Sequence, residues 1–190
     1  MNKFLLFLIP IFFISCSTQP IFKVYTLKTP TIKKVSSHKY TNKILKVMYP
    51  QSLKTAITQK ILFSYSASEQ GSYENAQWSN SMSKLLEGTF VEVMEESGLF
   101  KSVISYTSTA HEDFRLESNI FELSHKVREG SSESIVSIAF SLIRADKSIV
   151  IDAKKFTYII PTKTTNAKGY VDATNQALNQ MSHDLIEWLK

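Results

Sequence analysis

The chain has 190 residues, of which 43% are hydrophobic and 12% aromatic, and its formal net charge is +5 at pH 7. This composition is typical of a folded globular protein and excludes an intrinsically disordered one. The basic residues are scattered, and their densest pairs, Lys33-Lys34 and Lys154-Lys155, are typical of solvated faces, so we expect no nucleic-acid partner.

The chain begins with an apolar leader that ends at its single cysteine. The apolar run 4–14 follows one lysine, and the small residue Ser15 stands before Cys16. As a helix this run would span about 16 Å, less than a bilayer core of about 30 Å, so residues 1–15 predict a cleaved signal peptide. Two readings of the cysteine remain: a chance residue after a plain signal, or a lipobox thiol that is acylated at Cys16. We favour acylation, because a lone exported thiol has no disulfide partner, and we expect 16–21 to be a lipidated tether.

The first half of the mature chain predicts short strands and one long helix. Period-two alternation and turn residues predict strands over 22–27, 44–49 and 60–65, with a Lys-rich loop at 29–42, a helical turn at 51–55 and a turn at 71–75. Apolar residues at helical spacing predict a helix over 78–97, closed by Gly98 in the left-handed conformation. Gly88 within it is interpreted as a close packing contact, and Glu87 is expected off the apolar stripe.

The second half predicts an antiparallel meander and a final helix. We expect strands over 100–105, 114–127, 135–144 and 149–160, turns at 129–132 and 145–148, and a helix over 167–189. Ile120-Phe121 interrupts the alternation and predicts a bulge. Residues 22–190 should therefore form one α+β domain, a two-layer sandwich in which two long helices pack on one face of a mainly antiparallel sheet.

The residues that usually perform catalysis do not form a recognisable pattern. There is no Gly-x-Ser-x-Gly elbow, no metal-binding or phosphate-binding motif, and only four histidines. His183 and Asp184 are neighbours on a helix and point about 100° apart, and His125 is expected at an exposed strand position. We predict that the protein is not an enzyme and has no metal and no cofactor.

Three aromatic residues, Tyr65, Tyr73 and Trp78, bracket the turn that precedes the first helix. In one reading Trp78 seals the core at the start of the helix. In the other the three rings form an exposed tip that docks a partner, because tryptophan and tyrosine are enriched at interface hot spots.

The order of the motifs resembles that of one family. Tyr25-Thr26-Leu27 is followed by a strand ended by Pro50, by Gln77-Trp78-Ser79 before a helix, by 96–103 at its end, and by 113–117 before the meander. Together with the lipobox, this order resembles the ABC-type transport auxiliary lipoproteins, which include the paraquat-inducible protein C lipoproteins.

The resemblance implies a non-enzymatic role beside an ABC permease, its ATPase and a substrate-binding protein of the mammalian cell entry (MCE) type. Such systems move lipids or other hydrophobic molecules between the inner and outer membranes. Ser17 after the cysteine, in place of Asp, resembles outer-membrane sorting, with the domain facing the periplasm. Two alternatives stay open: a periplasmic carrier that binds a hydrophobic ligand directly, and assembly of several copies into a homo-oligomer.

Overall fold

The computed structural model describes residues 21–52 and 58–190. The predicted signal peptide, Cys16, most of the tether and residues 53–55 of the predicted helical turn lie outside the described residues. In chain order the elements are β1 (Lys23–Tyr25), β2 (Tyr40–Val47), β3 (Gln51–Ser52), β4 (Lys60–Ser64), β5 (Gln70–Trp78), α1 (Met82–Ser97), β6 (Phe100–Ser105), β7 (Phe114–Arg128), β8 (Ser131–Arg144), β9 (Ile149–Pro161) and α2 (Ala167–Leu189).

The strands form one sheet built around the long strand β7. One edge of β7 pairs antiparallel with β8, which pairs antiparallel with β9, so the predicted meander is confirmed. The other edge of β7 pairs in succession with β2, β3 and β4, all in parallel. Beyond these, β6 pairs parallel with β2, β5 pairs antiparallel with β4, and β1 pairs parallel with β5. Because the long pairings are antiparallel and the parallel ones are short, the sheet is mainly antiparallel, as predicted.

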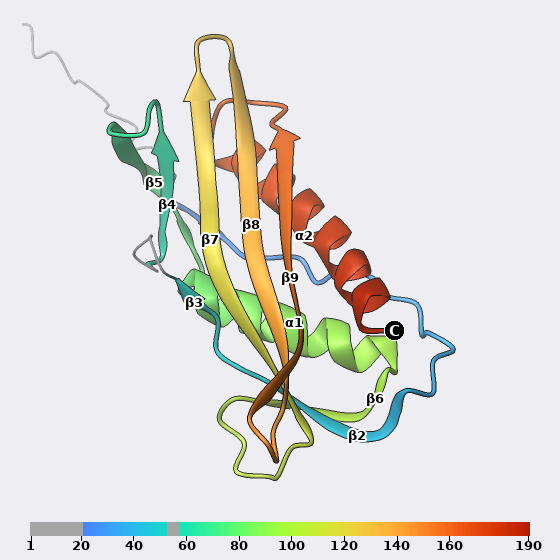
Figure 1. Cartoon of the computed structure of the whole chain (residues 1–190). Coiled ribbons are helices and arrows are strands. Elements are labelled where there is room, and N and C mark those ends of the chain that lie inside the picture. Colours follow the sequence, from blue (N-terminus) through green and yellow to red (C-terminus); the bar gives the residue numbers. More distant parts are fainter. Residues whose placement is uncertain (1–20, 53–57) are drawn as a thin grey trace, which may run out of the picture.

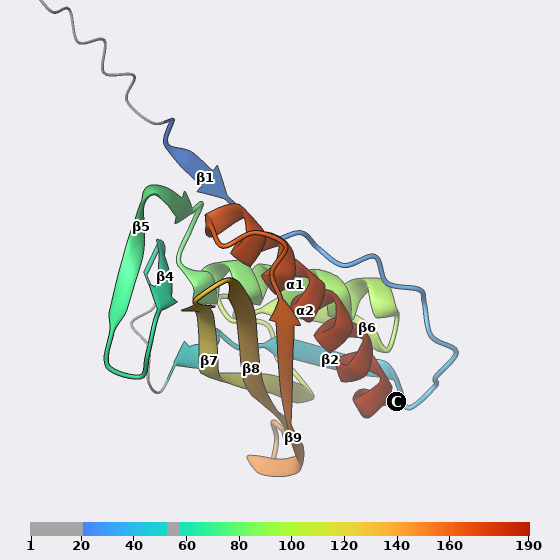
Figure 2. The same cartoon turned by 90° about the horizontal axis from the view of Figure 1, so that it is seen from above.

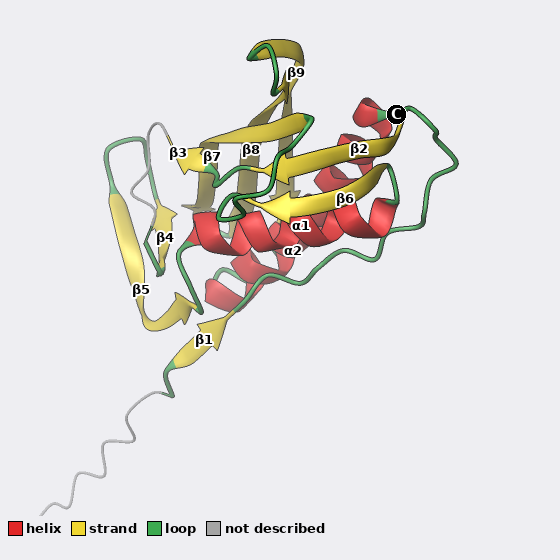
Figure 3. Cartoon of the chain, turned by 90° about the horizontal axis from the view of Figure 1, so that it is seen from below, coloured by secondary structure: helices red, strands yellow, loops and turns green. Residues whose placement is uncertain are grey.

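Both helices lie on one face of this sheet (Figure 1, Figure 2). Helix α2 packs on β8 and β9, whereas α1 packs on β6 and contacts α2 (Figure 3). Phe90 of α1 meets Phe140 of β8 edge to face, with ring centroids 5.0 Å apart, and both rings are fully buried. The predicted two-layer α+β sandwich is confirmed.

The second half of the chain follows the sequence pattern closely, except that β8 begins at Ser131, inside the turn predicted at 129–132 and four residues before the expected start. Helix α2 has the predicted bounds, and the register of β7 against β8 shifts between Ile120 and Glu122, where the bulge was predicted. Gly98 has φ 66° and ends α1 in the left-handed conformation, also as predicted.

Helix α1 starts four residues later than the expected position 78. The backbone amide of Trp78 donates to the carbonyl of Gln59 (2.7 Å), and that of Ser79 donates to the carbonyl of Tyr25 (2.6 Å). These amides are engaged in pairing between strands, so Trp78 is the last residue of β5 and the helix begins at Met82.

Two other boundaries in the first half differ from the prediction. The turn expected at 71–75 lies inside β5, and the hairpin instead closes where the amide of Tyr65 donates to the carbonyl of Glu69 (3.0 Å). Strand β2 begins within the predicted loop, at Tyr40, whose ring stacks on Phe100 with centroids 4.8 Å apart. The first boundary is thus fixed by a contact within the hairpin, and the second by a contact between distant segments.

Gly88 does not make the close contact that we expected. It lies on an exposed face of α1, and a Cβ added there would meet no atom within 4 Å. Because the space beside Gly88 is open, an alanine side chain would fit there. The two residues would then differ only in the greater backbone conformational freedom of glycine.

We expect Gly88→Ala to stabilise the protein by about 1 kcal/mol, because glycine in a helix interior is less favourable than alanine by that amount. Urea unfolding measures the change. Gly98→Ala is the matched control and should destabilise by about 1 kcal/mol, since the left-handed conformation penalises a Cβ. A loss of stability in Gly88→Ala would contradict the open space seen beside α1.

Candidate functional site

An aromatic row runs from the surface into the core at the end of the sheet where β4 and β5 lie. From the surface inward, its members are Tyr65, Phe63, Tyr73, His125, Tyr170 and Trp78. Successive ring centroids are 5.3, 5.0, 6.0, 5.1 and 6.1 Å apart. The row therefore joins the β4–β5 hairpin to β7 and to the first turn of α2.

The three predicted interface residues all belong to this row, but they lie at different depths. Tyr65 is 57% exposed, Tyr73 is half-buried and Trp78 is 2% exposed. The ring of Trp78 lies edge to face with Tyr170 inside the core. Trp78 is therefore a core residue, in agreement with the first of the two interpretations given above. Of the three, only Tyr65 presents most of its ring to solvent.

His125 is fully buried, which corrects the expectation of an exposed strand position. Its ring lies nearly parallel to that of Tyr170, at 12°, and its Nδ1 is 2.8 Å from the hydroxyl of Tyr73. The bulge after Ile120 is the cause. Before it the even-numbered residues of β7 face the helices, and after it the phase changes, so that His125 faces inward.

The side chains of His125 and Tyr73 are uncharged at neutral pH. Burial lowers the pKa of His125 from 6.5 to about 4. Burial, and to a lesser extent the proximity of Tyr65, raises the pKa of Tyr73 to about 12. Nε2 of His125 is buried with no hydrogen-bond partner among the described residues. Protonation of this imidazole would therefore place an uncompensated charge in the core.

A surface hollow of about 860 Å³ lies beside the row, between β1, β5 and the start of α2. Its apolar lining includes Ile21, Tyr25, Phe63, Tyr73, Ala76 and Ala167, and its charged lining consists of Lys23, Glu74 and Lys168. The arrangement combines apolar contact area with two cations and one anion, and contains no nucleophile paired with a base.

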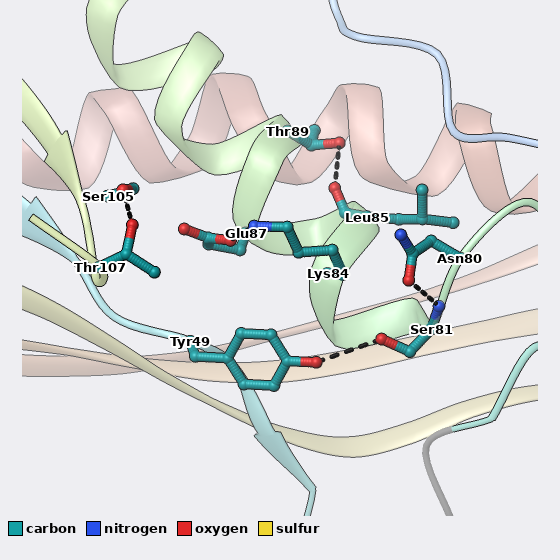
Figure 4. Close-up of polar contacts among 9 residues, drawn as sticks. All are labelled: Tyr49, Asn80, Ser81, Lys84, Leu85, Glu87, Thr89, Ser105 and Thr107. Carbon is teal, nitrogen blue, oxygen red and sulfur yellow. Dashed lines mark hydrogen bonds and ion pairs between the residues drawn. The ribbon is translucent and has the colours of Figure 1, made fainter.

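A polar cluster holds the start of α1 against the segment that follows β2 (Figure 4). The hydroxyl of Tyr49 is 3.1 Å from that of Ser81, and Lys84 forms an ion pair with Glu87 at 2.7 Å. Glu87 was expected off the apolar stripe, yet only 2% of it is exposed. The hydrogen bond to this carboxylate raises the pKa of Lys84. These contacts stabilise the junction and do not assemble a catalytic group.

Two further properties concern residues 21–52 and 58–190. Within these ranges no three His, Cys, Asp or Glu residues are grouped so as to hold a metal ion. No helix in them has the length and hydropathy needed to cross a membrane. His183 is exposed, and the carboxylate of Asp184 accepts a hydrogen bond from Tyr158.

Comparison with solved structures identifies the same fold in other proteins. A Xanthomonas campestris protein of the DUF330 family superposes with a TM-score of 0.72 at 20% identity, over 87% of this chain and 94% of that one. An uncharacterised protein superposes with a TM-score of 0.66 at 13% identity, over 90% of this chain and all of that one. At this identity the likeness concerns the fold.

The sequence comparisons identify the family. Among curated proteins none matches the chain significantly. The family model described as "ABC-type transport auxiliary lipoprotein component" matches residues 25–185, which contain the aromatic row, helix α1, most of helix α2 and nearly the whole sheet. The resemblance noted in the order of the motifs is thereby confirmed, and the chain belongs to the family of ABC-type transport auxiliary lipoproteins.

Proposed function

We propose that the protein is a membrane-anchored accessory subunit of an ABC transport system of the MCE type, which moves lipids or other hydrophobic molecules between the inner and outer membranes. The family match over residues 25–185 is the observation that carries this proposal. The family consists of transport auxiliary lipoproteins and is not known as an enzyme family. The protein would act by contact with the MCE-domain protein and with the permease and its ATPase.

The anchor in this proposal is a diacylglycerol-modified Cys16, exposed as the mature N-terminus once residues 1–15 are removed. Two or more acyl chains hold a protein stably at a membrane, because each buried CH₂ contributes about 0.8 kcal/mol. With Ser17 in the next position, we propose attachment to the outer membrane, with the domain in the periplasm.

Within the domain, the exposed end of the aromatic row is the proposed docking surface. Tyr65 contacts Phe63, which in turn contacts Tyr73, so the exposed ring rests on a rigid base that continues to the core. A large ring that is already immobilised loses little conformational entropy on binding, which is the property of an interface anchor.

Direct carriage of a hydrophobic ligand has less support. The core-facing rings of the row pack against one another, and the hollow beside them is bordered by Lys23, Glu74 and Lys168 at the surface. A carrier needs an enclosed apolar chamber to shield a lipid from water, whereas this hollow lies at the surface and has three charged residues in its lining.

Site-specific photo-crosslinking in the native host tests the docking surface. A photoreactive phenylalanine analogue in place of Tyr65 is expected to capture the MCE-domain protein, identified by mass spectrometry. The same analogue in place of Val150, which is similarly exposed at 55%, is the matched control and should not capture it. If the analogue at position 65 captures no transport component, Tyr65 is not part of the docking surface. If the analogue at position 150 captures the MCE-domain protein instead, the docking surface lies on β9.

A further inference from the structure

Three exposed apolar residues lie where the domain meets its tether. Ile21 is 81% exposed, Phe22 52% and Val24 57%. Together they form what we call the β1 patch. Phe22 and Val24 alternate with Lys23 and Tyr25, so they share the side of the strand that faces away from the core.

The β1 patch is fixed to the domain. β1 pairs with β5 in the register Lys23 to Ala76 and Tyr25 to Trp78, and the amide of Ser79 donates to the carbonyl of Tyr25 at 2.6 Å. Tyr25 also packs against the core. Val24 therefore has a fixed orientation relative to the rest of the protein, and Phe22 and Ile21 directly precede the paired strand.

The length of chain between Cys16 and Ile21 restricts where the β1 patch can be. Five residue steps reach at most about 18 Å when fully extended. An acylated Cys16 lies at the surface of the bilayer, so the first described residue must lie within this distance of the membrane. The patch is thus the described apolar surface that covalent geometry holds closest to lipid.

The charges around the β1 patch suit a phospholipid surface. Lys23 and Lys168 line the hollow that Ile21 also lines, and β1 lies beside the start of α2 (Figure 2). Lys168 pairs with Asp172, whereas Lys23 forms no ion pair with any residue in the described ranges. One carboxylate, that of Glu74, lines the same hollow. Lys23 lies on the other side of the strand from Phe22 and Val24, beside Ile21 in the lining of the hollow, so this end of the domain combines exposed apolar side chains with a free ammonium that can attract anionic headgroups.

From this geometry we infer that the β1 patch inserts into the headgroup region of the bilayer that holds the lipid anchor, and so sets one orientation of the domain at the membrane. The inference rests on the proposed anchor at Cys16. It implies that the opposite side of the molecule, where the turn between β8 and β9 lies, faces away from the lipid (Figure 3).

Fluorescence quenching by lipid tests this inference in the acylated full-length mature protein. The Phe22→Trp variant is reconstituted into vesicles of phosphatidylethanolamine and phosphatidylglycerol, with or without bromine on the acyl chains. Wild-type protein supplies the baseline from Trp78 and Trp188, and Val150→Trp is the control at a similarly exposed site on the far side. We expect bromine to reduce the added emission of Phe22→Trp about twofold, as for a side chain at the headgroup and acyl boundary, and to leave that of Val150→Trp unchanged.

The outcomes separate the inference from the anchor. Quenching confined to Phe22→Trp supports insertion of the β1 patch. No quenching in a protein that floats with the vesicles and carries acyl chains on Cys16 overturns the insertion and leaves the anchor intact. An unmodified Cys16 thiol overturns both. Equal quenching of both variants would show that no single orientation exists, and would also overturn the inference.

Discussion

Trp78→Ala is expected to lower the free energy of unfolding by about 3–5 kcal/mol, the usual result of truncating a buried aromatic side chain. The indole is 2% exposed, lies edge to face with Tyr170 and closes the core where β5 meets β1. Little can collapse into the space, because Trp78 is held by strand pairing on both sides. Urea unfolding followed by circular dichroism measures the change.

Tyr65→Ala is the matched control, since the two residues lie at opposite ends of the aromatic row. Its ring is 57% exposed, and we expect a change in stability of no more than about 0.5 kcal/mol. Similar losses from the two variants would contradict the division of the row into a core end and a surface end.

Acid is expected to destabilise the protein through His125. The pKa of this imidazole is lowered in the folded state from 6.5 to about 4. Between these two pH values the imidazole is therefore mostly protonated in the unfolded chain and mostly neutral in the folded protein. The contribution to stability is complete above pH 6.5 and is lost as the pH falls towards 4. The loss should reach about 3 kcal/mol, because each tenfold difference in proton affinity between the two states corresponds to about 1.4 kcal/mol.

His125→Phe supplies the comparison, because it keeps an aromatic ring against Tyr170 and removes the titrating group. The free energy of unfolding, measured by urea at several pH values, should fall less steeply in this variant than in the wild type. Acidic groups such as Glu112 and Asp113, whose pKa values are lowered by their hydrogen-bond partners, contribute equally to both proteins. Parallel pH profiles would show that His125 is not the group responsible.

The second half of the fold could be predicted from local sequence because its partners are neighbours along the chain. Strands β7, β8 and β9 follow one another through short turns, and each alternates at the strand period. Helix α2 carries its own apolar stripe and is capped by Asn166, whose side chain accepts a hydrogen bond from the amide of Gly169. Every signal needed for these elements lies within the segment that forms them.

The first half could not be predicted so well, because its boundaries depend on residues far away in the sequence. Trp78 has the spacing of a helical stripe that continues through Met82. Its pairing with Tyr25 and its hydrogen bond to Gln59 keep it in strand β5 instead. The parallel pairings of β7 with β2, β3 and β4 join segments that are far apart in the sequence, so the strands over 44–49 and 60–65 could be predicted but not the partner of each.

The aromatic row could be predicted only in part. Tyr65, Tyr73 and Trp78 form a group because they are close in sequence, whereas Phe63, His125 and Tyr170 come from three elements that only the fold brings together. The sequence does predict the bulge near Ile120, and a bulge changes which face the later residues occupy. Applied to β7, that rule alone would have placed His125 in the core.

We propose that this domain is tethered by lipid and works by contact with a transport system. Affinity purification of the full-length chain from crosslinked native membranes tests both parts of this proposal, with mass spectrometry of the copurified proteins and of the peptide that contains Cys16. We expect to recover an MCE-domain protein together with an acylated Cys16 at the mature N-terminus. An unmodified thiol, recovered without any component of an ABC transport system, would contradict it.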